Sequence, residues 1–411
     1  MSEFIMAQAN GRTIPLEDKI FGISRLAKEM IAEKGKDAVT NATIGALLDD
    51  EGKLVVLSSV VEVLRNLTPE DYAEYAPIGG TPEFKTSIKK ATFGSYEPKC
   101  FTEAVATPGG TGAIRNTIAN YTAIGDQVLT SDWFWATYNS IAGEIGRSVT
   151  TYTLFDKEGR FNVKAFETKI NELLMKQDSL MIILNTPAHN PTGYTFTLED
   201  WDQILAAVEA AAGQDKKVAL LVDVAYIDFA GDGIEYRKFM PKLENLPKNI
   251  LPIIAYSLSK TFTLYGMRCG AMICMTPDKQ IADEFVRVTQ FSARASWSNC
   301  TRASMVVLTK IYDDLKLLEK VNEEREFYRE VLVKRGKAFE EEAAKVGLEI
   351  VPFDSGFFAS IPCENPDEIG KKLQAEGIFL VPLAKGLRVS VASVSEERCR
   401  MLPAKILAAM K

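Results

Sequence analysis

The chain has 411 residues, of which 46% are apolar and 25% charged, a balance typical of a folded globular protein. With 48 Lys+Arg against 55 Asp+Glu the net charge is −7, and no basic stretch of the kind used for nucleic-acid binding is visible. The longest apolar runs fall far short of the ~20 residues that span a bilayer, and the N-terminus lacks a secretion-signal pattern. These features predict a cytoplasmic protein of two or three domains.

The cysteine and histidine content limits which metal sites, disulfides and acid–base groups the chain can form. The six cysteines never form a C-x-x-C pair, so we expect reduced, mostly buried thiols and no disulfide or metal framework. His189 is the only histidine, which excludes a multi-histidine metal site. Acid–base chemistry is therefore expected from Lys, Tyr, Asp or Glu side chains.

Between residues 100 and 275, short apolar runs alternate with stretches of helical spacing. The runs are EAVATP, DQVLTSD, SVTTYTLF, SLMIILNTP, KKVALLVDVAY, NILPIIAYSLSK and GAMICMTP. Such alternation is typical of a mostly parallel sheet with helices on both faces, and it predicts an α/β domain.

The C-terminal part of the chain has a different pattern. Residues 311–346 are rich in Glu, Lys and Arg with apolar residues at helical spacing, which predicts one or two long helices. The pieces GLEIVPFDSGFFASI, AEGIFLVPL and KGLRVSVAS then read as strands around a helix, a smaller α+β domain. We therefore expect a large domain at 51–310 and a small one at 311–411, with residues 1–50 packing on the small domain.

A glycine-rich turn follows the first predicted strand. In TPGGTGAIRNTI, Gly109, Gly110 and Gly112 stand where a helix begins, so backbone N–H groups and the positive end of the helix dipole are exposed to an anion. The segment matches neither G-x-x-x-x-G-K-[ST] nor G-x-G-x-x-G, which argues against a nucleotide site. It predicts a phosphate cradle, with simple turn chemistry as the alternative.

A lysine closes another predicted strand, in YSLSKTFTLYGMRCG. A lysine at the carboxyl end of a buried strand lies where α/β sheets bind ligands. Burial beside a cation such as Arg268 lowers the pKa of the Lys260 ammonium and makes the amine a nucleophile for carbonyls. Ser257, Ser259 and Arg268 are suited to holding a phosphate beside the glycine turn. The alternative for Lys260 alone is a solvated surface charge.

Two further strand ends carry polar groups. In LLVDVAYIDF, a buried Asp223 with Tyr226 needs a cationic partner, which a protonated pyridine nitrogen would supply, and helix capping is the alternative. In NTPAHNPTGY, Asn190 precedes a proline and can bind a cofactor or substrate oxygen, unless it serves only the turn. We interpret His189 as a packed or turn residue.

These motifs, in this order on one sheet, resemble those of a known family. The chain is similar to the class I aminotransferases, pyridoxal 5′-phosphate (PLP) enzymes of fold type I, and within them to the aspartate/aromatic group. The similarity covers nearly the whole chain, through TIGALLDDEG, YAPIGGTPEF, TPGGTGA, HNPTG, VDVAY, SLSK with its downstream arginine, and GLRVSV.

The resemblance implies a role for each motif residue toward PLP. Lys260 looks like the Schiff-base lysine and proton shuttle, and Asp223 like the partner of the pyridine nitrogen. Tyr226 and Asn190 would bind the ring's 3′-oxygen. The phosphate would be held by Gly110, Thr111, Ser257 and Arg268.

The resemblance also implies substrate and partner contacts. Arg388 in GLRVSV looks like the arginine that binds the substrate α-carboxylate, and Gly45 like the glycine whose backbone lies over the substrate. The aromatic residue that stacks on the ring is expected at Trp135, with Phe134 as the alternative. Tyr75 is similar to a tyrosine that reaches the phosphate from the partner subunit, which implies a homodimer with shared sites and no metal.

The implied activity is transfer of an amino group from an amino acid to a 2-oxo acid such as 2-oxoglutarate, by a ping-pong cycle through Lys260. Arg294 in SARASWSNCT resembles the arginine that pairs with a distal carboxylate. The family's tyrosine and two prolines are here replaced by Trp297, Cys300 and Thr301. Arg294 therefore indicates either a dicarboxylic substrate or a surface salt bridge, and the local aromatic residues leave room for an aromatic donor.

Three alternatives remain at this point. The same fold supports carbon–sulfur lyases that act by β-elimination, and fold alone does not separate the two reactions. A non-catalytic regulator would retain the fold without chemistry, although the lysine, aspartate and arginine are all present. A nicotinamide dehydrogenase lacks its G-x-G-x-x-G motif here.

Overall fold

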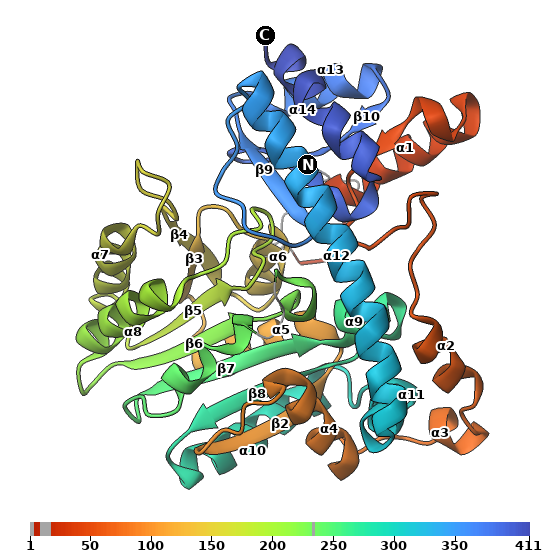
Figure 1. Cartoon of the computed structure of the whole chain (residues 1–411). Coiled ribbons are helices and arrows are strands. Elements are labelled where there is room, and N and C mark those ends of the chain that lie inside the picture. Colours follow the sequence, from red (N-terminus) through yellow and green to blue (C-terminus); the bar gives the residue numbers. More distant parts are fainter. Residues whose placement is uncertain (1–3, 9–17, 232–234) are drawn as a thin grey trace.

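A seven-stranded sheet dominates the computed structural model, which describes residues 4–8, 18–231 and 235–411 (Figure 1). Within these residues the strand order is β2-β8-β7-β6-β5-β3-β4. Neighbouring strands run parallel except at β8, which is antiparallel to both β2 and β7. The strands are β2 (Phe101–Thr107), β3 (Gln127–Ser131), β4 (Ser148–Tyr152), β5 (Ser179–Asn185), β6 (Lys217–Asp223), β7 (Ile250–Ser257) and β8 (Gly270–Thr276). The mostly parallel sheet predicted from the apolar runs is confirmed.

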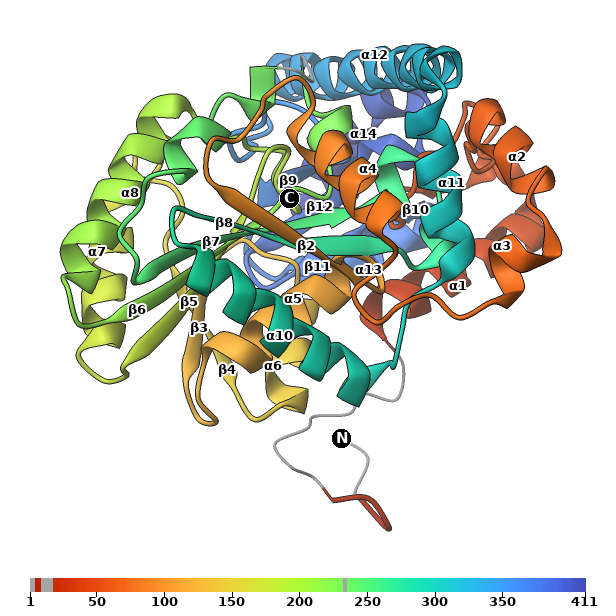
Figure 2. The ribbon, with the colours of Figure 1, turned by 90° about the horizontal axis from the view of Figure 1, so that it is seen from below.

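Helices cover both faces of this sheet, as the continuous burial of its central strands requires (Figure 2). One face packs against α5 (Gly109–Tyr121), α6 (Thr137–Glu144) and α10 (Lys279–Ser296). The other packs against α4 (Pro82–Phe93), α7 (Val163–Leu174), α8 (Leu198–Ala212) and α11 (Arg302–Asp313). Side chains cap the starts of α4, α7, α8 and α10, and at α8 Thr197 and Asp200 form a capping box.

The predicted long-helix region forms α11 and then α12 (Leu315–Val346), separated at Asp314, whose side chain caps α12. Figure 1 shows α12 running from beside α11 to the C-terminal helices. Along α12, Arg335 is buried and donates to the carbonyls of Leu48 and Ala392 at 2.9 and 3.0 Å. Val321 near the start of α12 packs in the core of the large sheet, and Ala338 and Phe339 pack in the core of the C-terminal part, so the helix joins the two parts.

The C-terminal part contains a small antiparallel sheet in the order β11-β12-β9. Its elements are β9 (Phe358–Pro362), α13 (Pro366–Ala375), β10 (Ile378–Phe379), β11 (Val381–Leu383), β12 (Gly386–Ser390) and α14 (Glu396–Met410). The N-terminal segment lies against it, because α1 (Lys19–Lys34) contacts β10 and β11, and β1 (Thr40–Asn41) pairs with β10. That two-residue strand was not predicted. The domain boundaries at residues 50 and 310 stay a prediction.

The remaining elements are short. They are α2 (Ser58–Arg65), α3 (Pro69–Ala73), α9 (Leu258–Thr261), η1 (Lys36–Ala38), η2 (Ile227–Phe229), η3 (Glu235–Arg237), η4 (Met240–Leu243), η5 (Tyr265–Met267) and η6 (Val391–Ser393). Across the described ranges, no helix is both long and apolar enough to cross a membrane.

The strand directions explain where a site forms. The carboxyl ends of β5, β6 and β7 meet at one edge of the sheet, and polar side chains at such an edge converge. Because β8 is antiparallel, it begins at that same edge, beside the end of β7 and the end of β2. The glycine turn, the lysine and the downstream arginine are therefore brought together.

Candidate active site

A cavity of about 560 Å³ opens at this edge of the sheet. It lies between the strand ends, the N-terminus of α5, the start of α1 and strand β12. Most of the predicted site residues line it: Gly45, Gly110, Thr111, Trp135, Asn190, Asp223, Tyr226, Ser257, Lys260, Arg268 and Arg388. Two predicted residues, Tyr75 and Arg294, do not.

Lys260 projects into this cavity from α9, the single helical turn that follows β7. Its Nζ lies 5.3 Å from the ring centroid of Tyr226 and 5.8 Å from that of Tyr265. Burial lowers the pKa of Lys260 to about 8, with Asp223 opposing the shift and the positive charges of Arg268 and Arg388 adding to it. About a tenth of the amine is therefore unprotonated at pH 7, far more than for an exposed lysine, and the unprotonated amine is what a nucleophile or proton acceptor requires.

Asp223 ends β6 and is buried on the cavity wall. Burial raises the pKa of its carboxyl, while a hydrogen bond from the Tyr138 hydroxyl, 3.0 Å from Oδ2, lowers it. Tyr138 was missed by the sequence analysis, although it lies one helical turn after Trp135 and its ring packs edge-on against that indole at 5.6 Å. The carboxylate is thus held by a neutral donor and lacks a buried cation in direct contact among the described residues.

The glycine turn forms an anion cradle at the start of α5. Gly109 has a φ of +69°, and a Cβ there would lie 2.8 Å from Arg268 Nη2, so only glycine allows this close approach. Gly110 and Thr111 form the first turn of the helix and line the cavity with Ser257. Arg268 itself has a left-handed backbone (φ 49°) and donates to Ser259 Oγ at 3.3 Å. Together these groups suit a phosphate.

Arg388 comes from β12 on the opposite wall and is only 4% exposed. It donates to Asn190 Oδ1 at 3.2 Å and to the Thr43 carbonyl at 2.9 Å, and its guanidinium lies 4.3 Å from the centroid of the Phe358 ring. Its buried Nε finds no hydrogen-bond acceptor within the described residues. Burial lowers the pKa of Arg388 to about 10, and no carboxylate among the described residues forms an ion pair with it, although a buried guanidinium usually has one.

Gly45 lies close to the Cζ end of the same Phe358 ring. A Cβ at position 45 would come within 2.7 Å of Phe358 Cζ, so a side chain there would displace the ring beneath Arg388. Nearby, the Tyr265 hydroxyl accepts a hydrogen bond from the Leu47 N–H at 3.0 Å and fixes this loop to the segment after Lys260. Phe358 and Tyr265 were both missed by the sequence analysis.

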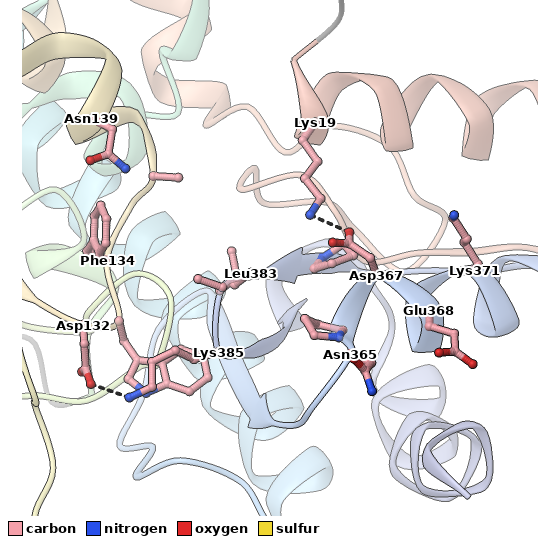
Figure 3. Close-up of a pocket in the computed structure, with 15 residues that line it drawn as sticks. Lys19, Asp132, Phe134, Asn139, Asn365, Asp367, Glu368, Lys371, Leu383 and Lys385 are labelled. Carbon is pink, nitrogen blue, oxygen red and sulfur yellow. Dashed lines mark hydrogen bonds and ion pairs between the residues drawn. The ribbon is translucent and has the colours of Figure 1, made fainter. Parts of the chain in front are cut away.

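The two aromatic alternatives face different spaces. Trp135 lines the cavity with Lys260, whereas Phe134 lines a neighbouring groove of about 750 Å³. In Figure 3, Phe134 and Asn139 lie on one side of that groove, and ion pairs join Lys385 to Asp132 and Lys19 to Asp367. This arrangement favours Trp135 as the residue available for stacking.

Tyr75 and Arg294 lie outside the cavity and are exposed. The Tyr75 side chain is 85% exposed, and Arg294 donates to Ser298 Oγ at 2.6 Å. Tyr75 follows α3 and Arg294 lies in the last turn of α10, and the segments just after these two residues are in contact, because Asn299 donates to the Ala76 carbonyl at 3.1 Å. Both residues therefore belong to one surface of the molecule, and neither lines this chain's own cavity.

The histidine and the cysteines take no part in the cavity. His189 is buried, its Nδ1 lies 2.8 Å from Thr192 Oγ1, and burial lowers its pKa to about 3, as expected for a packed turn residue. All six cysteines are free, and four of them are buried. The described ranges contain no cluster of His, Cys, Asp and Glu suited to a metal ion.

Comparison with known proteins identifies the family. Residues 37–406 match the family model described as aminotransferase class I and II. The chain belongs to this family. An aminotransferase of solved structure from Anaerococcus prevotii is 36% identical over 99% of this chain and 100% of that one, with a TM-score of 0.96.

Within this family, the chain is similar to aspartate and aromatic-amino-acid aminotransferases. Aspartate aminotransferase from Escherichia coli is 27% identical, covering 90% of this chain and 93% of that protein. Aromatic-amino-acid aminotransferase from Paracoccus denitrificans is 31% identical, covering 57% of this chain and 58% of that protein. An aromatic-amino-acid aminotransferase from Burkholderia pseudomallei, whose structure has pyridoxal phosphate covalently bound, shares the fold at a TM-score of 0.79, 21% identity and 99% and 100% coverage. The predicted resemblance to the aspartate/aromatic group is confirmed, and the protein is an aminotransferase enzyme.

Proposed function

We propose that this aminotransferase binds pyridoxal 5′-phosphate at Lys260 and moves an amino group from an aspartate-, glutamate- or aromatic-type amino acid to a 2-oxo acid by a ping-pong cycle. The observation that carries the proposal is the convergence of a lysine of pKa about 8, a buried Asp223 and two arginines on one cavity. When bound, the cofactor supplies an aldehyde that bonds to amines and a ring that withdraws electrons from the bonded carbon.

The residues present fit such a cofactor. The cradle of Gly110, Thr111, Ser257 and Arg268 offers N–H, hydroxyl and guanidinium donors to a phosphate. Asp223 suits a protonated pyridine nitrogen. Burial raises the pKa of its carboxyl, and a neighbouring cation would stabilise the charged carboxylate. Trp135 supplies an aromatic face, and Tyr226 and Asn190 supply a hydroxyl and an amide for the ring's oxygen.

The same side chains account for substrate handling. The unsatisfied Nε of Arg388 and its fixed fork suit a carboxylate, so we assign it the α-carboxylate of the amino acid. Asn190 holds the guanidinium in place, and Gly45 leaves room above the Phe358 ring. Lys260 would take the α-proton of the substrate on its Nζ and return it to the cofactor carbon that carries the transferred nitrogen. It would act first as a general base and then as a general acid, which its pKa of about 8 allows.

We further propose a homodimer in which Tyr75 and Arg294 reach the partner's cavity. Both are exposed, and the segments that follow them contact each other. Phe291, three residues before Arg294 on α10, is 78% exposed, a large apolar ring that a second copy would cover. In this arrangement Tyr75 would contact the partner's phosphate site. Arg294 would meet the side chain of a dicarboxylic substrate.

Arg294→Ala is expected to lower kcat/KM for aspartate about 10- to 100-fold and to leave an aromatic donor within about twofold, because a charge-assisted bond of ~1.5–3 kcal/mol is lost only with the dicarboxylate. Steady-state kinetics with both donors measure this. Arg287→Ala, on the same helix α10, is the control variant. Equal losses with both donors would refute the assignment of Arg294.

The visible spectrum of the purified protein tests the whole function. With pyridoxal phosphate added, we expect a visible band that aspartate or tyrosine removes and 2-oxoglutarate restores. Pyruvate and ammonia released without a 2-oxo acid acceptor would instead indicate the carbon–sulfur lyase reaction. A protein that shows no band after added pyridoxal phosphate would contradict the proposal.

A further inference from the structure

A buried carboxylate contacts the turn that carries Lys260 but does not line the cavity. Asp228 lies in η2, and its side chain is 10% exposed. Although burial opposes its ionisation, Arg237 and Arg325 hold the pKa of Asp228 at about 2. Four groups surround it: Arg237 Nη2 at 2.6 Å, Thr261 Oγ1 at 2.8 Å, the Tyr256 hydroxyl at 3.0 Å and Arg325 Nη1 at 3.7 Å.

Two of these contacts, from Tyr256 and Thr261, lie on either side of Lys260 in the sequence. Tyr256 precedes the end of β7, and Thr261 is the last residue of α9, directly after Lys260. Both hydroxyls donate to the same oxygen, Oδ2, and both side chains are almost completely buried. A single carboxylate therefore fixes the chain on either side of Lys260.

The other two contacts anchor the carboxylate. Arg237 also donates to the carbonyls of Thr92 and Ala91, at 2.9 and 3.1 Å, where α4 ends. Arg325 belongs to α12, and its guanidinium carbon lies 5.3 Å from the ring centroid of Phe262, the residue directly after α9. Arg237 and Arg325 therefore fix the position of the Asp228 carboxylate. Through its hydrogen bonds from the Tyr256 and Thr261 hydroxyls, the carboxylate in turn restrains the turn that carries Lys260.

We propose that Asp228 is a positioning residue for Lys260, which it holds through Tyr256 and Thr261 so that the free amine keeps its place for proton transfer. This inference rests on the proposed function. When the lysine is not covalently bonded, its flexible four-carbon stem is restrained only by its backbone and by the cavity wall. Displacements of about 1 Å in such a group slow a reaction by up to ~10²-fold, so an anchored turn has a direct effect on rate.

Thr261→Val tests this proposal with Thr261→Ser as its matched control. Valine keeps the branched shape of threonine and removes the donated hydroxyl, whereas serine keeps the hydroxyl. In the holoenzyme we expect Thr261→Val to lower kcat about tenfold with KM within about twofold. The isotope effect with a substrate deuterated at Cα should rise, because proton transfer by the displaced amine becomes slower. Thr261→Ser should stay close to wild type.

A second readout does not depend on turnover. The rate at which the apo-protein bonds covalently to added pyridoxal phosphate, followed by the visible band, should fall in Thr261→Val and not in Thr261→Ser. Thr289→Val is a second control, at a fully buried threonine on α10 whose hydroxyl, among the described residues, contacts Met272 Sδ alone, at 3.9 Å. It should change neither kcat nor the rate of covalent bonding. Asp228→Asn would leave two buried guanidiniums short of counter-charge and threatens folding, so Thr261→Val is the deciding variant.

The possible outcomes distinguish a failure of the positioning role from a failure of the proposed function. If the wild type bonds pyridoxal phosphate and transfers amino groups, but Thr261→Val matches it in kcat, isotope effect and bonding rate, the positioning role is wrong and the proposed function stands. Equal losses in the Val and Ser variants would also overturn it, because the hydroxyl would not be responsible. If the wild type neither bonds the cofactor nor transfers amino groups, the proposed function itself fails.

Discussion

Lys260→Ala protein is expected to lose amino-group transfer by at least about 10⁴-fold while remaining folded. General acid–base catalysis alone contributes ~10²–10⁴-fold, and the variant also lacks the nucleophile. Removing a buried amine whose charge is disfavoured should not destabilise the fold greatly, so circular dichroism and gel filtration should match wild type. Single-turnover transfer from aspartate and tyrosine measures the loss.

Borohydride reduction followed by peptide mapping gives the control for this prediction. Wild-type protein should retain the cofactor on the Lys260 peptide, and Lys260→Ala protein should retain none. Because the amine is protonated below a pKa of about 8 and neutral above it, the covalent uptake rate in wild type should rise about tenfold from pH 7 to pH 9 and then level off. Cofactor trapped on another lysine would contradict the assignment.

Asp223→Asn should have the second-largest effect, a fall in kcat of roughly 10³-fold. Asparagine keeps the size of the side chain and an oxygen for the Tyr138 hydroxyl, but it lacks the negative charge that stabilises a protonated pyridine nitrogen. A close pair of opposite charges with moderate screening attracts by about 4 kcal/mol, and losing that attraction lowers a rate by about three powers of ten. Steady-state kcat with saturating donor and added cofactor measures it.

Tyr138→Phe provides the matched comparison for Asp223→Asn. It leaves the carboxyl in place and removes only its hydrogen-bond donor, so its loss should be much smaller and should grow as the pH falls. The sign follows from the carboxyl: burial raises the pKa of Asp223 and the Tyr138 bond opposes that rise, so without the bond protonation begins at higher pH. Wild-type kcat in Asp223→Asn would show that the charge is not required.

The sheet and the strand-end residues could be predicted because their signals are local. The apolar runs that became β5, β6 and β7 are continuous, and each ends at a polar residue, Asn185, Asp223 or Ser257. Parallel strands place such ends on one edge, so residues far apart in the sequence could be assigned to one cavity without contact information. Gly110 and Lys260 were predicted by the same logic.

The residues that sequence analysis missed depend on long-range packing. Phe358 matters because both Gly45 and Arg388 lie close to its ring, an arrangement that no single segment encodes. Tyr138 and Tyr265 look like ordinary helix-face aromatics until the Asp223 carboxylate and the Leu47 N–H are brought to them. The roles of exposed residues such as Tyr75 depend on a second molecule, which the sequence of one chain describes only through resemblance.

The antiparallel course of β8 has a consequence for how the protein is made. Among the strands of the described residues, β2, whose end carries the glycine cradle, pairs with β8 alone, so its strand ladder cannot form until the ribosome has passed Thr276. At ~5–20 residues per second, that delay is on the order of ten seconds or more. During this time β2 and the growing edge of the sheet are unprotected strands, which are prone to pair with other chains. We therefore expect the newly synthesised chain to aggregate most readily before β8 emerges, and holdase chaperones to bind it most in that interval.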